Sequence, residues 1–321
     1  MKTVISTDRA AAVELLRKGD LVALPTETVY GVAANALNPI GVAKIFEVKE
    51  RPRFDPLIVH LPNRGWLRRI VELPSGNRQL ILELADKFWP GPFTMVLPKC
   101  GIVPDIVTSG LNTVAVRFSA HPVFAEIVGE FDEPLAAPSA NRFGRVSPTT
   151  AQHVMDELGG RISLIVDAGP TEHGIESTIV AVQDGAIAIL RRGPITAEQL
   201  SEFAEVITVV GTSKISSPGQ LPSHYAPKTP LRLVDNAEEF HPQKNYCVGL
   251  LAWSSAARSP QVFAAVRILS DRGDLREAAA NLFRYLRELD TLGLDLIVAE
   301  RVPSRGVGAA IMDRLERASH R

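Results

Sequence analysis

Short apolar runs recur through the first two thirds of the chain, and some alternate with helical patterns while others follow one another directly. Runs of four to six apolar residues bounded by turn residues are typical of buried β-strands. The predicted strands cover residues 21–24, 57–61, 94–97, 113–118, 164–167, 177–182, 186–190 and 206–210, with helices at 8–18, 39–49, 77–88, 149–158 and 197–204. Because strand 186–190 follows strand 177–182 without a helix between them, we predict a mixed sheet that helices cover.

A segment rich in Gly, Pro and Ser separates this region from the rest of the chain. It spans residues 211–230, GTSKISSPGQLPSHYAPKTP, and lacks apolar periodicity, as a linker does. After it come strand patterns at 231–235, 246–252, 266–269 and 294–299, an amphipathic helix from about residue 275, and a final helix from about 308. We therefore predict a catalytic α/β domain over 1–210, a linker over 211–230 and a small Rossmann-like three-layer α/β domain over 231–321.

Composition excludes several classes of protein. Apolar residues make up 45% of the chain and charged residues 22%, as in ordinary globular proteins. No apolar run approaches the ~18–20 residues that span a bilayer, and Asp8 and Arg9 interrupt the start before a secretory signal could form. Two cysteines, Cys100 and Cys247, are too few and too far apart for a disulfide scaffold or a metal knuckle. A cytoplasmic protein without membrane association is expected.

The net charge of −1 gives no support for nucleic-acid binding by itself. Locally, however, residues 44–69 hold seven cations against three anions. A cationic patch of this size in an otherwise acidic region indicates a bound anion more than a track for a polyanion.

Four segments place polar side chains at the ends of predicted strands, where α/β proteins build their sites. The first, PTETVYG (Pro25–Gly31), crowds four hydrogen-bonding side chains into one turn, which could also be a simple capped turn. The second is KERPRFDPLIVH (Lys49–His60). Lys49 lies on the buried stripe of its helix and Arg51 follows the helix end, although cations at a helix C-terminus are also ordinary dipole partners. His60 could equally be a core histidine.

The third segment, LAAPSANRFGRVSPT (Leu135–Thr149), runs from a small-residue strand into Ser139 and Asn141. Small side chains let a ligand approach the backbone, and hydroxyl and amide groups can bind phosphate or ribose. Ser147 is at the same time the predicted N-cap of helix 149–158, with Pro148 at its first position.

The fourth group consists of polar residues within strands: Thr113, Arg117, Ser177 and Arg191. Thr113 and Arg117 are four residues apart and share a face. An arginine inside a strand needs an anion or solvent, because a buried unpaired charge costs several kcal/mol.

The four segments supply cations, hydroxyls and amides without an evident general base or nucleophile. This set suits phosphoryl or nucleotidyl transfer, so the residues alone predict an anion- or nucleotide-binding α/β enzyme.

Lys49-x-Arg51 combined with Ser139-x-Asn141 resembles the signature pair of the YrdC family. The strings PTETVYG, RPxxxPLIVH, FWPGPFT, VAVRFSAHP, APSAN followed by SPTT, and IESTIV add to this resemblance, which covers residues 5–210. SPGQLPSHYAPKTP and GVGAAIMDRL are similar to the linker and extra C-terminal domain of two-domain members. The resemblance implies a YrdC-like mixed twisted sheet covered by helices.

The family resemblance also implies a reaction. Such proteins are L-threonylcarbamoyladenylate synthases, nucleotidyltransferases that condense L-threonine, bicarbonate or CO2, and ATP into threonylcarbamoyl-AMP and pyrophosphate. Mg2+ is expected with the phosphates. Partner proteins would then transfer the threonylcarbamoyl group to an adenosine beside the anticodon of tRNA, and a weak contact of this chain with tRNA is also expected.

The same resemblance implies roles for individual residues. Lys49 and Arg51 would neutralise developing charge. L-threonine would be held by Thr28, His60, Arg117, Ala137 and Ser177, and ATP by Lys49, Arg51, Asp55, Thr113, Ser139, Asn141, Ser147, Arg191 and Tyr225. Asp55 stands where relatives often have Asn, so it either helps to hold Mg2+ or points away; no other metal ligand is predicted.

Two other functions remain open. The cations of 44–69 could serve a module that binds double-stranded RNA or tRNA without consuming ATP, with steeply salt-dependent affinity. A related carbamoyl-transfer enzyme of hydrogenase maturation is less expected, because the chain lacks the acylphosphatase-like and zinc-finger segments of those proteins.

Overall fold

The computed structural model describes residues 2–208, 224–243, 245–255 and 262–320, which form two compact units. The first unit comprises residues 1–143, 148–171 and 176–220, and the second comprises 144–147, 172–175 and 221–321. Most of the linker predicted over 211–230 lies outside the described residues. No helix in the described ranges is both long and apolar enough to cross a membrane.

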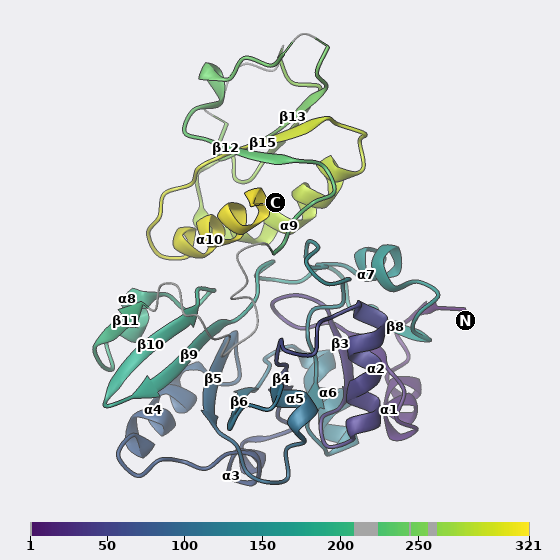
Figure 1. Cartoon of the computed structure of the whole chain (residues 1–321), viewed down its shortest axis with the longest axis vertical. Coiled ribbons are helices and arrows are strands. Elements are labelled where there is room, and N and C mark those ends of the chain that lie inside the picture. Colours follow the sequence, from purple (N-terminus) through teal and green to yellow (C-terminus); the bar gives the residue numbers. More distant parts are fainter. Residues whose placement is uncertain (1, 209–223, 244, 256–261, 321) are drawn as a thin grey trace. The chain divides into compact units, whose positions relative to one another are not determined.

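The first unit is built on one mixed sheet, as predicted (Figure 1). Its strand order is β1 (Val4–Ser6), β8 (Leu164–Val166), β2 (Val22–Leu24), β3 (Gly31–Asn35), β7 (Leu135–Ala136), β4 (Ile58–His60), β6 (Thr113–Arg117), β5 (Phe93–Pro98), β9 (Thr178–Gln183), β10 (Ala186–Arg191) and β11 (Val206–Thr208). Parallel pairs such as β4·β6 and β5·β9 are interleaved with antiparallel pairs such as β5·β6 and β9·β10. This mixture brings strand ends from distant parts of the sequence to one edge.

Helices pack against both faces of this sheet. One face packs against α1 (Arg9–Arg17) and α6 (Pro122–Phe131), whose apolar residues meet those of β2, β3 and β8. The larger core on the other face includes residues of α2 (Pro39–Lys49), α3 (Leu67–Ile70), α4 (Arg78–Phe88), α7 (Ala151–Leu158) and α8 (Ala197–Leu200). The remaining helical turns are η1 (Arg64–Trp66) and α5 (Asp105–Thr108).

Local signals explain where two functional segments begin. Asn38 caps α2 by accepting from the backbone amides of Ile40 and Gly41, so the helix starts with Pro39 and delivers Lys49 at its last position. The predicted start of helix 149–158 is wrong: its N-cap is Thr150, which accepts from His153 N. Ser147 is therefore not a cap, because the chain reaches helical geometry only at Ala151.

The second unit has a parallel four-stranded sheet in the order β12 (Leu231–Val234), β15 (Leu296–Glu300), β13 (Val248–Ala252) and β14 (Ala265–Ile268). The helices α9 (Leu275–Asp290) and α10 (Gly308–Ser319) pack against these strands and against each other. A separate apolar cluster around Ala237 of the short helix η2 (Ala237–Glu239) includes Phe240 and Phe263. The predicted small α/β architecture is confirmed.

Candidate functional site

The register of the first unit's sheet brings three of the predicted threonine-binding residues together. His60 ends β4 and Arg117 ends β6, and the two are directly paired in these parallel strands. Ala137 follows β7 and donates its amide to Ile58 O of β4 at 3.1 Å. The side chains of His60 and Arg117 are buried. Three residues that lie 20 to 77 positions apart in the sequence are thus brought onto neighbouring strands of the sheet.

His60 is held as a neutral ring. It packs against Phe124 with ring centroids 4.9 Å apart. Burial foremost, and the charge of Arg117 next, lower the pKa of His60 to about 3. At neutral pH the imidazole therefore offers a lone pair and one N–H rather than a charge.

The turn between β2 and β3 carries Thr28 at its centre. Thr26 Oγ1 donates to Val29 O at 2.6 Å and lies 2.8 Å from Thr28 Oγ1. Because a hydroxyl has only one proton and that of Thr26 goes to Val29 O, Thr28 must be the donor in the threonine pair. Thr28 Oγ1 is then left with lone pairs only, so it can accept a hydrogen bond from a ligand.

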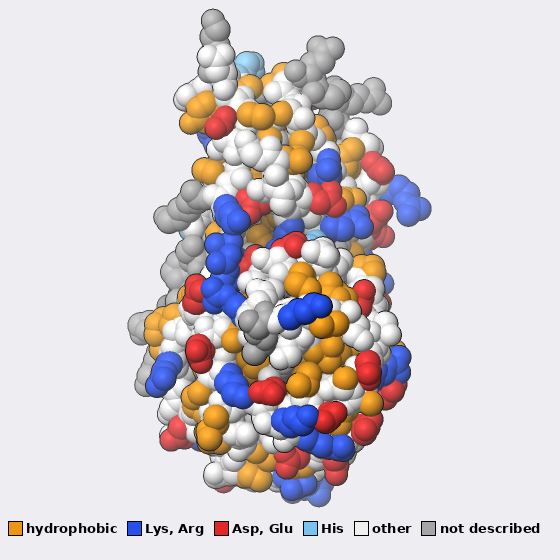
Figure 2. All heavy atoms as spheres, turned by 90° about the vertical axis from the view of Figure 1, so that its right-hand side faces the viewer, with side chains coloured by type: hydrophobic (Ala, Val, Ile, Leu, Met, Phe, Trp, Pro, Cys, Tyr) orange, Lys and Arg blue, Asp and Glu red, His pale blue; other side chains and the backbone are white. Residues whose placement is uncertain are grey.

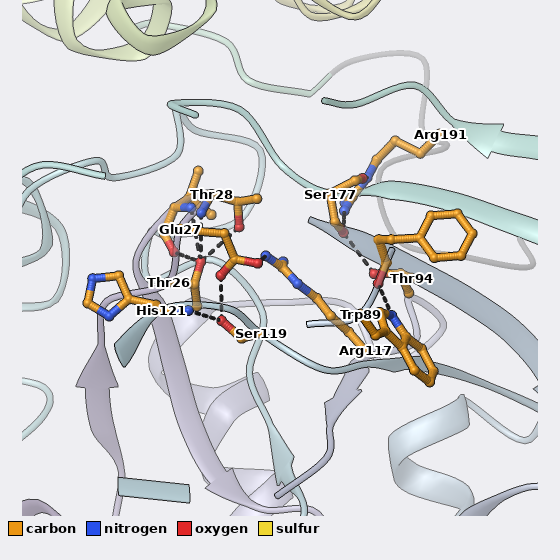
Figure 3. Close-up of polar contacts among 12 residues, drawn as sticks. Thr26, Glu27, Thr28, Trp89, Thr94, Arg117, Ser119, His121, Ser177 and Arg191 are labelled. Atoms are coloured by element: carbon orange, nitrogen blue, oxygen red, sulfur yellow. Dashed lines mark hydrogen bonds and ion pairs between the residues drawn. The ribbon is translucent and has the colours of Figure 1, made fainter. Parts of the chain in front are cut away.

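Glu27 of the same turn faces Arg117 (Figure 3). Glu27 Oε1 lies 2.7 Å from Arg117 Nη2, and the Ser119 hydroxyl donates to Glu27 Oε2. Burial acts to raise the pKa of Glu27, but the charge of Arg117 and the hydrogen bonds from Ser119 and Arg117 outweigh it and lower that pKa to about 2. The pair is ionised on both sides at neutral pH.

A second buried network joins Ser177 to Arg191, so it links a residue predicted for threonine to one predicted for ATP. Arg191 Nη2 donates to Ser177 Oγ at 3.0 Å and its Nε donates to Ser177 O at 3.1 Å. The hydroxyls of Ser177 and Thr94 lie 2.8 Å apart (Figure 3). Thr94 is in turn the registered partner of Arg117 across β5 and β6. The two networks are therefore adjacent in the sheet.

Lys49 clamps the loop that contains the signature residues Ser139 and Asn141. Its ammonium donates to the backbone oxygens of both, and the side chain is buried. Burial, with a contribution from the charge of Arg51, lowers the pKa of Lys49 well below its usual range. Lys49 lies on the buried stripe of its helix, as predicted, and its charged end is buried as well. Two backbone carbonyl groups take the place of water around the ammonium.

Arg51 and Asp55 form a buried ion pair. Arg51 Nη2 lies 2.8 Å from Asp55 Oδ2, and Arg51 also donates to Asp55 O and Pro56 O. Burial raises the pKa of Asp55, and the charges of Arg51, Lys49 and Arg191 oppose this rise. The charges of three predicted nucleotide-binding cations thus act on one carboxylate, and Arg51 contacts it directly. Asp55 points toward Arg51.

The other predicted residues are less closely connected to this cluster. Thr113 is half-buried at the first position of β6, four residues and about 13 Å along the strand before Arg117. Asn141 is buried and donates to Arg142 O at 2.8 Å. Ser147 and Tyr225 belong to the second unit.

Tyr225 is packed inside the second unit. It is 1% exposed, its ring stacks on Phe283 at 5.5 Å, and Arg314 lies over it at 5.2 Å. Its φ of 62° is unusual for a residue other than glycine. Replacing a side chain so enclosed would therefore cost stability, contrary to what its place in a predicted linker indicates.

The seven cations of residues 44–69 do not act as one patch. Lys44 pairs with Asp20 at 2.8 Å, Arg64 pairs with Asp86, and Arg69 lies over the Trp66 ring at 3.5 Å. On the face shown in Figure 2, basic and acidic side chains of the first unit are interspersed. Lys49 and Arg51 instead turn inward. The sequence prediction of a single local patch was wrong, which removes the main support for an RNA-binding module.

The described residues contain no group of three or more His, Cys, Asp or Glu side chains suited to hold a metal ion. A surface cavity of about 510 Å³ is present in the described part of the first unit, and its lining includes Trp66, Arg69 and Phe131. None of the predicted site residues lines this cavity. The candidate site is therefore the polar cluster on the sheet.

Glu27, Thr94 and Ser119 are parts of the cluster to which sequence reasoning assigned no role. Glu27 was noted as one of several polar residues in a turn, while Thr94 and Ser119 fall in the strings FWPGPFT and VAVRFSAHP. A polar residue in or just after an apolar strand was the available signal. Their partners, however, come from other strands.

Two family profiles and several named relatives match this chain. Residues 14–193 match the Sua5/YciO/YrdC family profile described as "Telomere recombination", and residues 195–320 match the one described as "Threonylcarbamoyl-AMP synthase, C-terminal domain". The chain is 41% identical to a threonylcarbamoyl-AMP synthase of Bacillus subtilis, over 97% of this chain and 92% of that protein. It is 38% identical to the enzyme of that name from Pyrococcus abyssi, over 96% and 93%.

A solved structure extends the similarity to the fold. The crystal structure of Pyrococcus abyssi Sua5 complexed with L-threonine matches with a TM-score of 0.88 and 35% identity, covering 99% of this chain and 98% of that one. The resemblance seen in the sequence motifs is confirmed: the chain belongs to the Sua5/YrdC family.

Proposed function

We propose that this chain is a threonylcarbamoyl-AMP synthase that uses L-threonine, bicarbonate or CO2, and ATP. Relatives of that name align over nearly its whole length. The observation that carries the proposal is the pair of hydrogen bonds from Arg191 to Ser177. These bonds join residues predicted to bind L-threonine to residues predicted to bind ATP in one buried cluster. An enzyme that couples an amino acid to a nucleotide needs two adjacent binding sites of this kind.

The amino acid would bind at Arg117. Its Nε has no hydrogen-bond partner among the described residues, although the side chain is 3% exposed. A planar guanidinium suits a carboxylate. Thr28 would accept a hydrogen bond from the threonine, His60 and Ser177 would complete the seat, and the small Ala137 leaves room beside β4.

The nucleotide would bind at Arg51, Arg191 and the 139–141 loop. Arg51 and Arg191 would neutralise charge on the phosphates. Lys49 would act by holding Ser139 and Asn141 in place, because its ammonium is already used by their carbonyl groups. Asp55, Thr113, Ser147 and Tyr225 stay proposed contacts of ATP.

The reaction would proceed through a carbamate. The ammonium of bound threonine first loses a proton to solvent. The resulting neutral amine attacks the carbon of CO2, whose C=O π electrons move to oxygen, and a second proton leaves the nitrogen to solvent, so that an N-carboxylate forms. A carboxylate oxygen then attacks the α-phosphorus of ATP, forming a new P–O bond as the bond to pyrophosphate breaks. Arg51 and Arg191 would stabilise the charge that develops on the phosphates. No residue of the protein becomes covalently modified.

A magnesium ion held by the protein does not fit the donor set. Mg2+ prefers several oxygen ligands in octahedral geometry, often from one or two carboxylates and the substrate phosphates. The nearby carboxylate, Asp55, is paired with Arg51 at 2.8 Å. Magnesium would therefore arrive as part of the nucleotide substrate.

After the reaction, partner proteins would pass the threonylcarbamoyl group to tRNA.

Pyrophosphate release tests the proposal. The purified chain should release pyrophosphate from ATP with threonine and bicarbonate present, and should do so much less when threonine is omitted or replaced by serine. Arg51→Gln should lose this activity, whereas Arg53→Gln, at the exposed neighbouring position, should retain it. Equal release with and without threonine, or a trapped adenylated or carbamoylated enzyme, would overturn the proposal.

A further inference from the structure

We propose that Glu27 is a positioning residue that orients Arg117 and gives the amino-acid binding site a net charge of zero. The site then selects a zwitterion over a ligand that carries only a carboxylate. This inference rests on the proposed binding of threonine at Arg117. It concerns a residue whose carboxylate faces the site from the turn between β2 and β3 (Figure 3).

The geometry of the pair is restrictive. Glu27 Oε1 meets Arg117 Nη2 at 2.7 Å, while Ser119, two residues beyond Arg117, donates to the other carboxylate oxygen. The side chains of Glu27 and Arg117 are 5% and 4% exposed. One carboxylate is thus held at both oxygens, and it restrains the Nη2 end of the guanidinium in turn. Fixing a binding group before the ligand arrives reduces the entropy that binding must overcome.

The guanidinium is not fully used by this pairing. Arg117 Nε is buried and has no hydrogen-bond partner in the part of the chain that the structure describes. A purely structural ion pair would be expected to satisfy its donors, because leaving a buried donor unpaired costs about 1–3 kcal/mol. The free Nε therefore points to a ligand acceptor, and a carboxylate fits it.

Charge balance then favours one class of ligand. The Glu27 carboxylate is ionised, since its pKa is about 2, and it offsets the charge of Arg117. His60 beside them is neutral at neutral pH. A ligand that carries only a carboxylate is repelled by the Glu27 carboxylate, because charges in the protein interior are poorly screened. An ammonium on the same ligand is attracted to Glu27 and offsets this repulsion.

Direct binding measurements test this role. Calorimetry would compare L-threonine with (R)-3-hydroxybutanoate, which keeps the carboxylate, hydroxyl and methyl groups but lacks the ammonium. In Glu27→Gln, threonine should bind about tenfold or more weakly, the size of one lost hydrogen bond to a charged group. The deamino analogue should lose less affinity, so the preference for threonine should shrink. KM for ATP should stay within about twofold.

Two further variants separate positioning from folding. Glu27→Asp keeps the charge and should recover part of the preference for threonine. Asp20→Asn, which removes the partner of Lys44 in the same unit, should leave both affinities unchanged. The inference is overturned if folded Glu27→Gln keeps the parent's threonine affinity and preference, or if affinity for ATP and threonine fall equally. Failure of the parent to release pyrophosphate would instead count against the proposed function, since binding is measured separately.

Discussion

The two units bury arginine in different ways. In the first unit, Arg117 is paired with Glu27 from a distant turn and keeps a buried Nε without a partner in the described chain. In the described part of the second unit, Arg314 is the largest fully buried side chain, is paired with the adjacent Asp313, and lies over Tyr225. One arginine is paired with a residue brought from another segment of the chain. The other is paired with the residue that precedes it in the same helix and lies over an aromatic ring.

This difference follows from the sheets. The mixed sheet of the first unit juxtaposes strand ends from separate parts of the sequence, so polar groups converge where several strands stop. The parallel sheet of the second unit places α9 and α10 against its strands, and their buried residues are mainly apolar. Buried charge in the first unit is therefore interpreted as a site, and in the second as part of the packing.

Replacing the two arginines is the strongest way to break this comparison. Arg117→Lys keeps the charge but loses the planar fork, and we expect threonine-dependent pyrophosphate release to fall about 100-fold, near the upper end for one charge-assisted hydrogen bond. Arg314→Lys should lower the melting temperature and leave KM for threonine unchanged. If Arg314→Lys lowered threonine-dependent pyrophosphate release as much as Arg117→Lys does, the contrast between the units would be wrong.

Tyr225 tests the packing of the second unit. Tyr225→Ala should lower the free energy of unfolding by about 3–5 kcal/mol, because it empties a buried aromatic position against Phe283. Tyr246, which is 51% exposed, provides the matched control, and Tyr246→Ala should cost little. Chemical denaturation measures both. Equal stability of the two variants would argue against the buried placement of Tyr225.

Acid titration of stability sharpens the description of the first unit. The folded pKa of His60, about 3, lies below its ordinary value of 6.5, so the unfolded chain binds more protons between these values. Stability should therefore be fully present above pH 6.5 and decline as the pH falls toward 3, by a few kcal/mol. His60→Gln should show a shallower decline over this window. An unchanged slope in denaturation curves would show that His60 is not buried as a neutral ring.

The smallest expected effect concerns the hydroxyl pair in the turn. Thr26→Val removes the acceptor that takes the proton of Thr28, so Thr28 can rotate and donate instead. We expect KM for threonine to rise about fivefold, the value of one neutral hydrogen bond. Thr26→Ser keeps the hydroxyl and should behave as the parent. Steady-state kinetics decide, and equal KM values for the valine and serine variants would contradict the proton assignment.

Long periodic elements were predictable, and short or small-residue ones were not. Helix 39–49 is confirmed with the same bounds, because Asn38 and Pro39 mark its start. The sequence analysis missed α6, a mainly apolar run that lacks a clear polar face, and β3, whose residues GVAAN have little strand preference. These two elements form when the rest of the sheet is present to pack against them.

The polar motifs marked the site, but their partners were not evident from them. PTETVYG indicated a turn with too many hydrogen-bonding groups for its own needs. That Glu27 faces Arg117, 90 residues later, depends on where two strands end in a mixed sheet.

The sequence by itself determined the family, the elements with strong periodicity and the places where polar residues interrupt apolar runs, because these are properties of neighbouring residues. Only the tertiary structure decided that Lys49 holds two carbonyl groups, that Asp55 faces Arg51 and that Arg117 Nε has no partner among the described residues. Burial and pairing depend on groups that the fold brings together from distant positions. The free energy of a buried charge is set by those groups and not by its neighbours along the chain.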